Sequence, residues 1–229
     1  MDRVLHDHPA VYDALYARKP YGEEVAFVLE RVPMAERALV VGCGTGEHTR
    51  QLEEAGVDAV GVDPSAAMVR RAREKSDAEF LVGSLPELPV SGRFDLVMVP
   101  FTLVNCLEPE ELAPALSALA DRVAEGGVLV LDTDEFPEME APTLRTASGP
   151  EGDCARLLQC RRLEDRRVCM DALVFDGSSW FVDRHLLTAF DDETVALSLA
   201  ERGFVVKRLD WDADETAMAD RSVFVAKRA

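Results

Sequence analysis

The stretch ALVVGCGTGEHTRQLEEAGVDAVGVD, residues 38–63, decides the fold of this 229-residue chain. Its apolar run at 38–41 is short and bounded by glycine, as is typical of a buried parallel strand. Three glycines follow, then a helical pattern, and then a second apolar run at 59–62 that ends in Asp63. This order of strand, glycine turn, helix, strand and acid is the first half of a nucleotide-binding β-α-β unit.

Each part of this unit has a physical role. Gly42, Gly44 and Gly46 allow a sharp turn and let a ligand approach the backbone closely. Free amides at the start of the following helix favour a negatively charged or carbonyl group nearby. Asp63 stands at the carboxyl end of the second strand, where a carboxylate can accept hydrogen bonds from two ribose hydroxyls. We therefore expect a nucleoside to bind here.

The spacing of the glycines bears on which nucleoside binds. Dinucleotide-binding turns place a third glycine three residues after the second, whereas Gly46 is only two residues after Gly44. The sequence GCGTG at 42–46 resembles motif I of the class I S-adenosylmethionine (SAM) methyltransferases. We therefore favour SAM over NAD as the cofactor. An NAD-dependent oxidoreductase remains the alternative of another class.

The composition limits the class of protein. No apolar run approaches the ~18 residues of a membrane span, and the first ten residues contain no apolar signal core. Five cysteines without a CxxC pair are typical of reduced thiols in a cytoplasmic protein. A net charge of -18 argues against nucleic acid as the substrate. We expect a cytoplasmic protein with no metal centre, no membrane contact and no nucleic-acid partner.

The rest of the first half continues the parallel pattern. Two helical segments, at 8–18 and around 25–29, precede the first strand and either cap the ligand cleft or cover one edge of the sheet. Further strands are predicted at 79–82, 94–99 and 128–131. We expect a helix between each pair of successive strands, which implies a parallel sheet. The loop from Pro100 to Asn105 follows the fourth strand and should therefore line the transfer site.

Residues 135–190 do not continue the alternation of strands and helices. Alternating patterns at 155–163, 168–175 and 179–190 predict three antiparallel strands laid over the carboxyl edge of the main sheet. This segment is rich in arginine, which could clamp a phosphate or simply lie exposed near a turn. The arginines are Arg156, Arg161, Arg162, Arg166, Arg167 and Arg184.

The end of the chain distinguishes two kinds of α/β fold. A helix at 194–202 is followed by two strands, 203–209 and 221–225, with no helix between them. This ending closes a seven-stranded sheet with one antiparallel strand, whereas dinucleotide folds finish with a parallel sixth strand. The predicted fold class is thus α/β, with a Rossmann-like, mostly parallel seven-stranded sheet and a small antiparallel insertion. The expected division is a SAM-binding core with a helical cap at 1–134, a substrate-side insertion at 135–190, and the end of the core at 191–229.

Four stretches together resemble one group of enzymes. They are YDALY at 12–16, GCGTGEH at 42–48, FDLVMVPFTLVNCL at 94–107 and DRHLLTAFDDETVALSLAERGFVV at 183–206. The chain resembles the SAM-dependent N,N-dimethyltransferases that act on the amino group of nucleotide-linked deoxysugars, and their relatives near glycine N-methyltransferase. This resemblance implies a small-molecule substrate and SAM as the cofactor.

The resemblance also implies roles by position. Tyr21 would close over the methionine end of SAM, Asp63 would hold the ribose, and Pro100 would flank the sulfonium. Ser84 stands where the family has an acid that meets the adenine amino group, which weakens that contact. The residues expected to bind the cofactor are Tyr21, Gly42, Cys43, Gly44, Gly46, His48, Asp63, Pro64, Gly83, Ser84, Leu85 and Pro100.

The expected reaction is an in-line methyl transfer to an amine. The loop after the fourth strand contains neither an Asn-Pro-Pro-Tyr run nor Pro-Cys, so a nucleic-acid base is not the expected acceptor. His185 and Tyr12 are the candidate catalytic residues, because either could help the amine to lose its proton. An O-methyltransferase and a SAM-binding protein without transfer activity stay open as alternatives. Whether the chain forms a homodimer also stays open.

Overall fold

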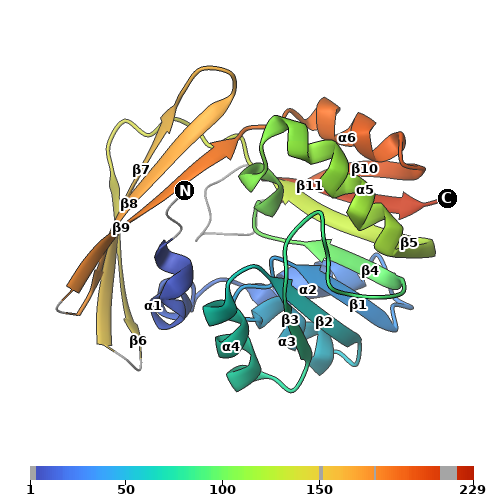
Figure 1. The fold of residues 1–229 in the computed structure, drawn as a ribbon, viewed down its shortest axis with the longest axis horizontal. Coiled ribbons are helices and arrows are strands. Elements are labelled where there is room, and N and C mark those ends of the chain that lie inside the picture. The colour runs from blue at the N-terminus through green and yellow to red at the C-terminus, as the bar shows by residue number, and fades with distance from the viewer. Residues whose placement is uncertain (1–3, 150–151, 178, 212–220) are drawn as a thin grey trace.

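The computed structural model describes residues 4–149, 152–177, 179–211 and 221–229. Its strands form a seven-stranded sheet and a separate four-stranded sheet. In Figure 1 the smaller sheet lies at the left, and helix α1 (Pro9–Leu15) lies between it and the larger sheet. Among the described residues, no helix combines the length and apolar character that crossing a bilayer requires.

The first 133 residues supply the N-terminal helices and five strands of the larger sheet. Before the first strand come η1 (Val4–Asp7), α1 and α2 (Tyr21–Leu29). The elements of the sheet are β1 (Arg37–Val41), α3 (Glu47–Glu54), β2 (Asp58–Asp63), α4 (Ala66–Lys75), β3 (Glu79–Val82), β4 (Phe94–Val99), η2 (Leu103–Cys106), η3 (Pro109–Glu111), α5 (Leu112–Arg122) and β5 (Val123–Thr133). The last part of the chain adds α6 (Asp192–Ala200), β10 (Phe204–Trp211) and β11 (Arg221–Arg228).

The larger sheet has the strand order β10-β11-β5-β4-β1-β2-β3. Strands β1, β2, β3, β4 and β5 pair in parallel, whereas β11 pairs antiparallel with both β5 and β10. The predicted seven-stranded sheet with one antiparallel strand is therefore confirmed. This arrangement brings the carboxyl ends of β1 and β4 together at the centre of one edge, where the glycine turn begins.

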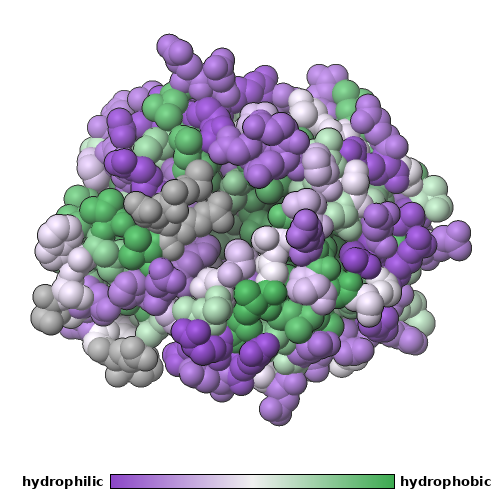
Figure 2. Space-filling view, viewed as in Figure 1, coloured by the Kyte–Doolittle hydropathy of each residue, from purple (hydrophilic) through white to green (hydrophobic). Residues whose placement is uncertain are grey.

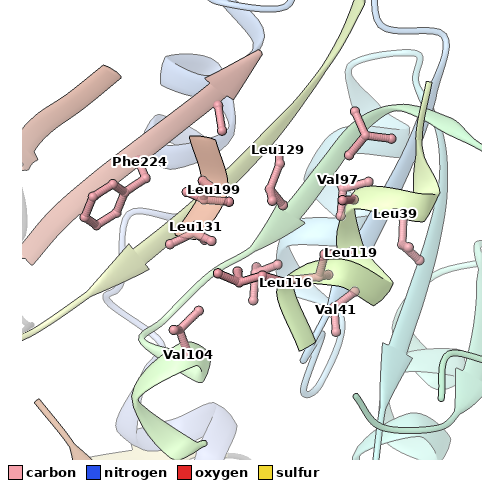
Figure 3. Packing of buried hydrophobic residues seen from close by; sticks show 14 of the residues in the cluster. Leu39, Val41, Val97, Val104, Leu116, Leu119, Leu129, Leu131, Leu199 and Phe224 are labelled. Atoms are coloured by element: carbon pink, nitrogen blue, oxygen red, sulfur yellow. The ribbon is translucent and has the colours of Figure 1, made fainter. Parts of the chain in front are cut away.

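The sheet is buried on both faces, which explains why its strands are continuously apolar. Along β1, Leu39 and Val41 join the cluster under α5 and α6, while Ala38 and Val40 join the cluster under α2, α3 and α4. Figure 3 shows the first cluster, with leucines of α5 and Leu199 of α6 packed onto the strands. Alternate residues of each central strand thus anchor opposite helical layers.

One expectation about the core is wrong. No helix connects β3 to β4; residues 83–93 form an irregular loop instead. This loop contains Pro86 and Pro89, and Gly92 adopts a positive φ of 79°. Proline removes a helical hydrogen bond and fixes the backbone, so a loop with two prolines and glycines at both ends does not sustain a helix.

The smaller sheet has four strands, so the predicted three-stranded insertion is also corrected. It consists of β6 (Thr143–Gly149), β7 (Gly152–Arg162), β8 (Arg167–Asp176) and β9 (Ser179–Thr188), paired antiparallel in that order. The missed strand, β6, reads TLRTASG and has Leu144 as its one large apolar side chain. An edge strand of small and polar residues lacks the apolar alternation that identifies a strand in sequence.

Helix α1 and the segment before it fasten the smaller sheet to the rest of the molecule. Leu5, Val11 and Leu15 share one buried cluster with Cys154, Leu158, Ala172 and Val174 on the inner face of that sheet. The N-terminal helices therefore do more than cover an edge of the core. They fill the space between the two sheets and close one side of it.

Asn105 connects the two sheets through buried hydrogen bonds. Its side-chain amide donates to the carbonyl oxygens of Asp134 at 3.0 Å and Thr188 at 2.8 Å, and its side-chain oxygen accepts from the Asp134 amide at 3.0 Å. Thr188 is the last residue of β9, and Asp134 directly follows β5. One fully buried side chain thus sets the position of the smaller sheet against the carboxyl edge of the larger one.

Asn105→Ala should destabilise the protein, because it leaves three buried backbone groups without their partners. We expect the free energy of unfolding to fall by about 2–4 kcal/mol, measured by urea denaturation. Thr146→Ala on the exposed side of β6 is the control and should change little. If the two variants unfold at the same urea concentration, Asn105 does not have this role.

Candidate functional site

One cavity of about 160 Å³ lies between the carboxyl edge of the larger sheet and the inner face of the smaller sheet. In Figure 2 the surface is hollowed near the middle of the face shown. The residues of the sequence prediction that line this cavity come from five separate parts of the chain. They are Tyr12, Gly42, Gly44, Asp63, Pro100 and His185.

The glycines of the turn have different structural roles. All have positive φ, at 73° for Gly42, 53° for Gly44 and 86° for Gly46. A Cβ on Gly46 would lie 2.8 Å from Ala72 and 2.9 Å from Phe80, so this glycine lets α3 pack close to the sheet. A Cβ on Gly44 would meet nothing closer than Tyr12 at 3.8 Å. Gly44 is therefore the glycine that leaves the floor of the cavity open to a ligand.

Asp63 is buried and its carboxylate is held by the turn that it faces. One carboxylate oxygen accepts from the Gly44 amide at 2.9 Å and the other accepts from the Ser65 amide at 2.9 Å. The carboxylate is thus fixed in orientation and lines the cavity, as a ligand for a pair of ribose hydroxyls requires.

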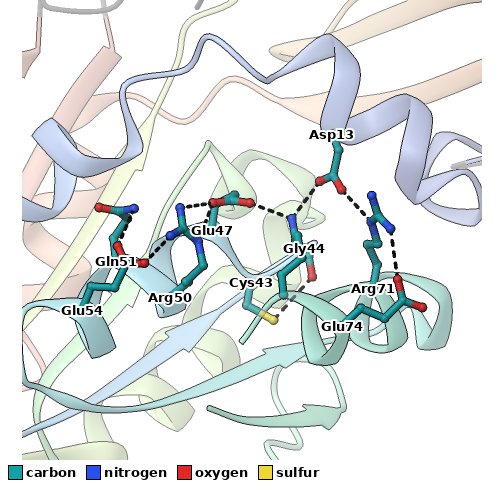
Figure 4. Close-up of polar contacts among 10 residues, drawn as sticks. Asp13, Cys43, Gly44, Glu47, Arg50, Gln51, Glu54, Arg71 and Glu74 are labelled. Carbon is teal, nitrogen blue, oxygen red and sulfur yellow. Dashed lines mark hydrogen bonds and ion pairs between the residues drawn. The ribbon is translucent and has the colours of Figure 1, made fainter. Parts of the chain in front are cut away.

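A charged cluster secures α1 beside the glycine turn. Asp13 of α1 accepts from Arg71 at 2.8 Å and from Lys75 at 2.9 Å, and Lys75 also donates to Glu47 at 2.8 Å. Figure 4 shows this cluster next to Gly44. Partial burial would raise the pKa of Asp13, but hydrogen bonds with Thr45, Arg71 and Lys75 hold it below its ordinary value. The contacts fix the helix that carries Tyr12 above the turn.

The segment before α1 spans the cavity from one sheet to the other. Ser65 donates its hydroxyl to the carbonyl of His6 at 2.8 Å, and the Leu5 amide donates to Asp183 of β9 at 3.1 Å. Leu5 and His6 both line the cavity. This segment therefore forms a wall over the site that is hydrogen-bonded at both sides.

Three aromatic rings form a second wall. Tyr12 and Tyr16 have ring centroids 4.6 Å apart, and Tyr16 meets Phe101 edge-on at 5.0 Å. Burial raises the pKa of Tyr12 well above its ordinary value, and the neighbouring Tyr21 and Asp63 add to that rise. At neutral pH Tyr12 is therefore a protonated phenol that can donate a hydrogen bond. It is not a base.

His185 and Asp183 form a buried pair on the inner face of β9. The ring Nε2 of His185 lies 2.8 Å from a carboxylate oxygen of Asp183. Burial on its own would lower the pKa of His185, but hydrogen bonds with Asp183 and Cys106 outweigh it and raise the pKa to about 9. At neutral pH the imidazole is mostly protonated, with its charge balanced by Asp183.

Several predicted cofactor residues do not line the cavity. Cys43 is buried in the core, Gly46 packs on Phe80, and Pro64 and Ser84 are exposed. The Gly83 amide donates to the carbonyl of Asp63 at 3.1 Å, so the 83–85 segment lies directly beside Asp63. Ser84 and Leu85, which were expected at the adenine, therefore lie with the predicted Pro64 and Gly83 at one end of the site, outside the cavity.

Tyr21 and His48 belong to a buried network behind the cavity. His48 lies 2.5 Å from Glu24, which also accepts from Lys19 and from Arg221; Arg221 in turn donates to Asp132. Burial would raise the pKa of Glu24, but His48 and Lys19 hold it far below its ordinary value. Tyr21 packs edge-on against the His48 ring at 4.9 Å. Arg221 alone of these residues reaches the cavity.

The loop after β4 lines the site, as predicted, and it is strained. Phe101 and Thr102 have positive φ values of 63° and 57°, which non-glycine residues seldom adopt. The Thr102 amide donates to Asp132 at 2.7 Å, and this bond helps to hold the conformation. Strained backbone of this kind is concentrated at functional sites. The single sequence carries no pattern that reveals it.

Sequence reasoning also missed residues that the fold brings into the cavity. Asp183, Cys106 and Arg221 line it, and Arg156 was predicted only as one of six arginines of the insertion. The alternation of β9 could have placed Asp183 on the same face as His185. The position of Arg221 depends on how β11 enters the sheet, which no local pattern encodes.

Comparisons with known proteins agree with this geometry. A family model described as a methyltransferase domain matches residues 38–127. A dTDP-3-amino-3,4,6-trideoxy-alpha-D-glucopyranose N,N-dimethyltransferase from Streptomyces venezuelae is 30% identical over 219 residues, covering 89% of this chain and 92% of that protein. A dTDP-3-amino-3,6-dideoxy-alpha-D-glucopyranose N,N-dimethyltransferase from Streptomyces fradiae is 34% identical over 191 residues, covering 80% of this chain and 75% of that protein.

Solved structures are similar over nearly the whole chain. Streptomyces venezuelae DesVI has a TM-score of 0.83 and 28% identity, and the match covers 97% of this chain and 98% of that one. An amino pentose methyltransferase from Micromonospora echinaspora, solved with SAM bound, has a TM-score of 0.76 and 28% identity, with 93% of each chain covered. The similarity thus includes both sheets.

The titration of His185 should appear in the stability of the protein. Folding raises its pKa from 6.5 to about 9, so the contribution is complete below pH 6.5 and is lost as the pH rises through about 9. Relative to His185→Gln, the wild type should lose roughly 2–3 kcal/mol of unfolding free energy between about pH 6 and pH 10. Urea denaturation at both pH values measures this difference.

Thr146→Ala, which changes an exposed side chain of β6, provides the control for this experiment and should follow the wild type at both pH values. A constant difference between wild type and His185→Gln across the range would contradict the assigned pairing with Asp183.

Proposed function

This chain belongs to the SAM-dependent methyltransferases, and from that premise we propose that it transfers methyl groups from SAM to the amino group of a nucleotide-linked aminosugar. The predicted family and the predicted cofactor are both confirmed by the relatives. Two relatives that span most of the chain are, by name, N,N-dimethyltransferases of dTDP-linked aminosugars. These names support the proposed acceptor.

The observation that carries the proposal is that one cavity joins the two halves of the site. Gly44, Asp63 and Pro100 approach from the larger sheet, and His185 faces them from the smaller sheet. The open floor at Gly44 and the fixed carboxylate of Asp63 fit the nucleoside end of SAM. The smaller sheet then supplies the surface for the acceptor.

The protein mainly needs to align the reactants. SAM supplies a methyl group that is already activated by its sulfonium. Holding an acceptor in line with such a donor can contribute roughly 7–11 kcal/mol of effective concentration. Tyr12 can donate a hydrogen bond, and the rigid walls around Tyr16 and the His6 segment restrict the orientation of what enters. These side chains are positioning residues in the proposal.

His185 is proposed to handle the proton of the amine. An attacking amine must lose a proton before or during the transfer. The neutral imidazole can accept it, and Asp183 at 2.8 Å stabilises the imidazolium that forms. Because the pKa of His185 is about 9, the accepting form is a minor species at neutral pH and grows as the pH rises. The side chain therefore assists the transfer without being indispensable.

Two of the alternative functions are set aside, and a third is left to the assay described below. An NAD-dependent oxidoreductase is set aside, because the chain is a methyltransferase and β11 runs antiparallel to its neighbours. A SAM-binding protein without transfer activity is likewise set aside by the family. O-methylation of a small acid or hydroxyl is an outcome of the test below. The division of the chain at 134 and 190 and the cytoplasmic location stay predictions.

A transfer assay tests the proposal. The enzyme is incubated with labelled SAM and either nucleoside-diphosphate-linked aminosugars or their hydroxyl counterparts, and products are identified by mass spectrometry and NMR. We expect one or two methyl groups on the nitrogen of the aminosugar nucleotides alone. Transfer to the hydroxyl counterparts, with the amines left unmodified, would overturn the proposal.

Asp63→Ala should weaken SAM binding by at least about 100-fold, because two hydrogen bonds to a charged group are lost. Calorimetric titration measures the dissociation constant, and circular dichroism checks that the variant is folded. Asp58→Ala changes an exposed acid at the opposite end of β2 and is the matched control. Normal SAM binding by Asp63→Ala would show that the ribose site is assigned wrongly.

We also propose that two copies of the chain associate through the outer face of the smaller sheet. Leu144, Leu157, Leu173 and Val182 align in register across all four strands, and Phe175 pairs with Trp180 beside them. Trp180 is 66% exposed and Leu144 is 67% exposed. In Figure 2 hydrophobic residues gather at the left, where Figure 1 places this sheet.

The shape and charges of this face favour a second copy as its partner. Two antiparallel sheets pack well face to face, and a two-fold axis brings the same patch together from both copies. Asp171 and Arg184 lie side by side on this face, so a two-fold axis can set each charge against its opposite.

Sedimentation velocity tests the association. Trp180→Asp should convert dimers to monomers, whereas Val205→Asp, at a 70% exposed apolar residue on β10, should leave them intact. A monomeric wild type would overturn this proposal.

A further inference from the structure

Arg156 differs from the other arginines that the sequence analysis singled out in the smaller sheet and its connections. Five of those six form ion pairs with carboxylates. These pairs are Arg161–Asp171, Arg162–Glu135, Arg166–Asp191, Arg167–Glu108 and Arg184–Asp171. Within the described parts of the chain, Arg156 has no such partner. Arg156 lines the cavity, and its Nη1 donates to Tyr16, which lines it too.

The contacts of Arg156 leave most of its donors unused. Nη1 donates to the hydroxyl of Tyr16 at 2.7 Å, and the guanidinium carbon lies 5.4 Å from the centre of that ring. The Nε–H is buried and has no hydrogen-bond partner within the described residues. A buried donor of a charged group without a partner is costly. An anion bound beside the guanidinium in the cavity would balance its charge and accept from its remaining Nη donors.

The positive charge of Arg156 lacks a carboxylate partner although the protein as a whole is strongly acidic. The chain carries a net charge of -18, so carboxylates are abundant elsewhere on the molecule. The other cavity cations are balanced: Arg221 by Glu24 and Asp132, and His185 by Asp183. Arg156 is thus a local positive charge within a site whose surroundings are acidic, and it faces the space that a substrate enters.

The position of Arg156 indicates which part of the reaction mixture it meets. Tyr12 lies against Gly44 of the cofactor turn, Tyr16 is the next ring, and Arg156 lies beyond Tyr16 on β7. Two aromatic rings therefore separate Arg156 from the floor that receives the cofactor. The charge belongs to the half of the cavity that the smaller sheet provides, which is the acceptor half.

We infer that Arg156 binds the diphosphate of the acceptor, with the Tyr16 hydroxyl as a second donor. This inference rests on the proposed function, since it assigns the anionic part of a nucleotide-linked substrate to one side chain. The planar guanidinium presents paired N–H donors that match phosphate oxygens. Tyr16 accepts from Nη1, which leaves its own O–H free to donate to the same anion.

The test measures binding of thymidine diphosphate to the enzyme loaded with S-adenosylhomocysteine, by calorimetric titration. Arg156→Ala should weaken this binding at least about tenfold and leave the affinity for S-adenosylhomocysteine unchanged. Arg156→Lys should retain part of the affinity, because lysine keeps the positive charge but lacks the paired N–H donors of the guanidinium. Arg156→Gln serves as the informative variant if Arg156→Ala does not fold.

Arg161→Ala is the matched control. It lies on the same strand but is exposed and paired with Asp171, so its removal should not change nucleotide binding. A second readout uses a phosphate-free aminosugar glycoside as the acceptor. Its kcat/KM should be the same in wild type and Arg156→Ala, while kcat/KM for the nucleotide-linked aminosugar should fall in the variant through a higher KM.

The inference and the proposed function fail in different ways. If the enzyme methylates hydroxyls but binds thymidine diphosphate through Arg156, the proposed function fails and the anion site stands. If the wild type does not bind thymidine diphosphate, or Arg156→Ala binds it normally, the inference is overturned even when aminosugars are methylated. A loss of S-adenosylhomocysteine affinity alone in Arg156→Ala would assign the side chain to the cofactor instead.

Discussion

The fixed separation of two sheets is the constraint on which this structure depends. The cavity exists only because the smaller sheet is held away from the carboxyl edge of the larger one at a set distance. Asn105 of η2 links the loop after β4 to the ends of β5 and β9, and the N-terminal segment spans the gap through Ser65 and Asp183. The bonds of Asn105 and the bond from Leu5 to Asp183 are buried, so they are protected from competition with water, whereas the bond from Ser65 to His6 is partly buried.

The distribution of charge follows from the same constraint. Carboxylates on the cofactor side are fixed by backbone amides, as Asp63 is by Gly44 and Ser65. On the acceptor side, Asp183 ties together the N-terminal segment and His185 with its two oxygens. One carboxylate thus serves both the architecture and the proton balance of the site. Alignment of reactants, which is the main requirement of methyl transfer, is achieved by this shared rigidity.

The sequence predicted the cofactor half of the site better than the acceptor half. The glycine turn, Asp63 and the antiparallel last strand are local or topological patterns that one chain reveals, and the seven-stranded sheet is confirmed. Strand β6 was missed because its side chains are small and polar, and the helix before β4 was wrongly expected where prolines prevent one. The contacts of Arg156 and Arg221 depend on long-range packing, which periodicity does not encode.

The central claim is that cofactor and acceptor meet in the single cavity between the two sheets. A crystal structure of the enzyme with S-adenosylhomocysteine and a nucleotide-linked aminosugar tests it most directly. The account predicts the ribose hydroxyls on Asp63, the sulfur near Pro100, and the sugar nitrogen between that sulfur and His185. Cofactor density outside the cavity, or an acceptor bound away from the inner face of the smaller sheet, would contradict it.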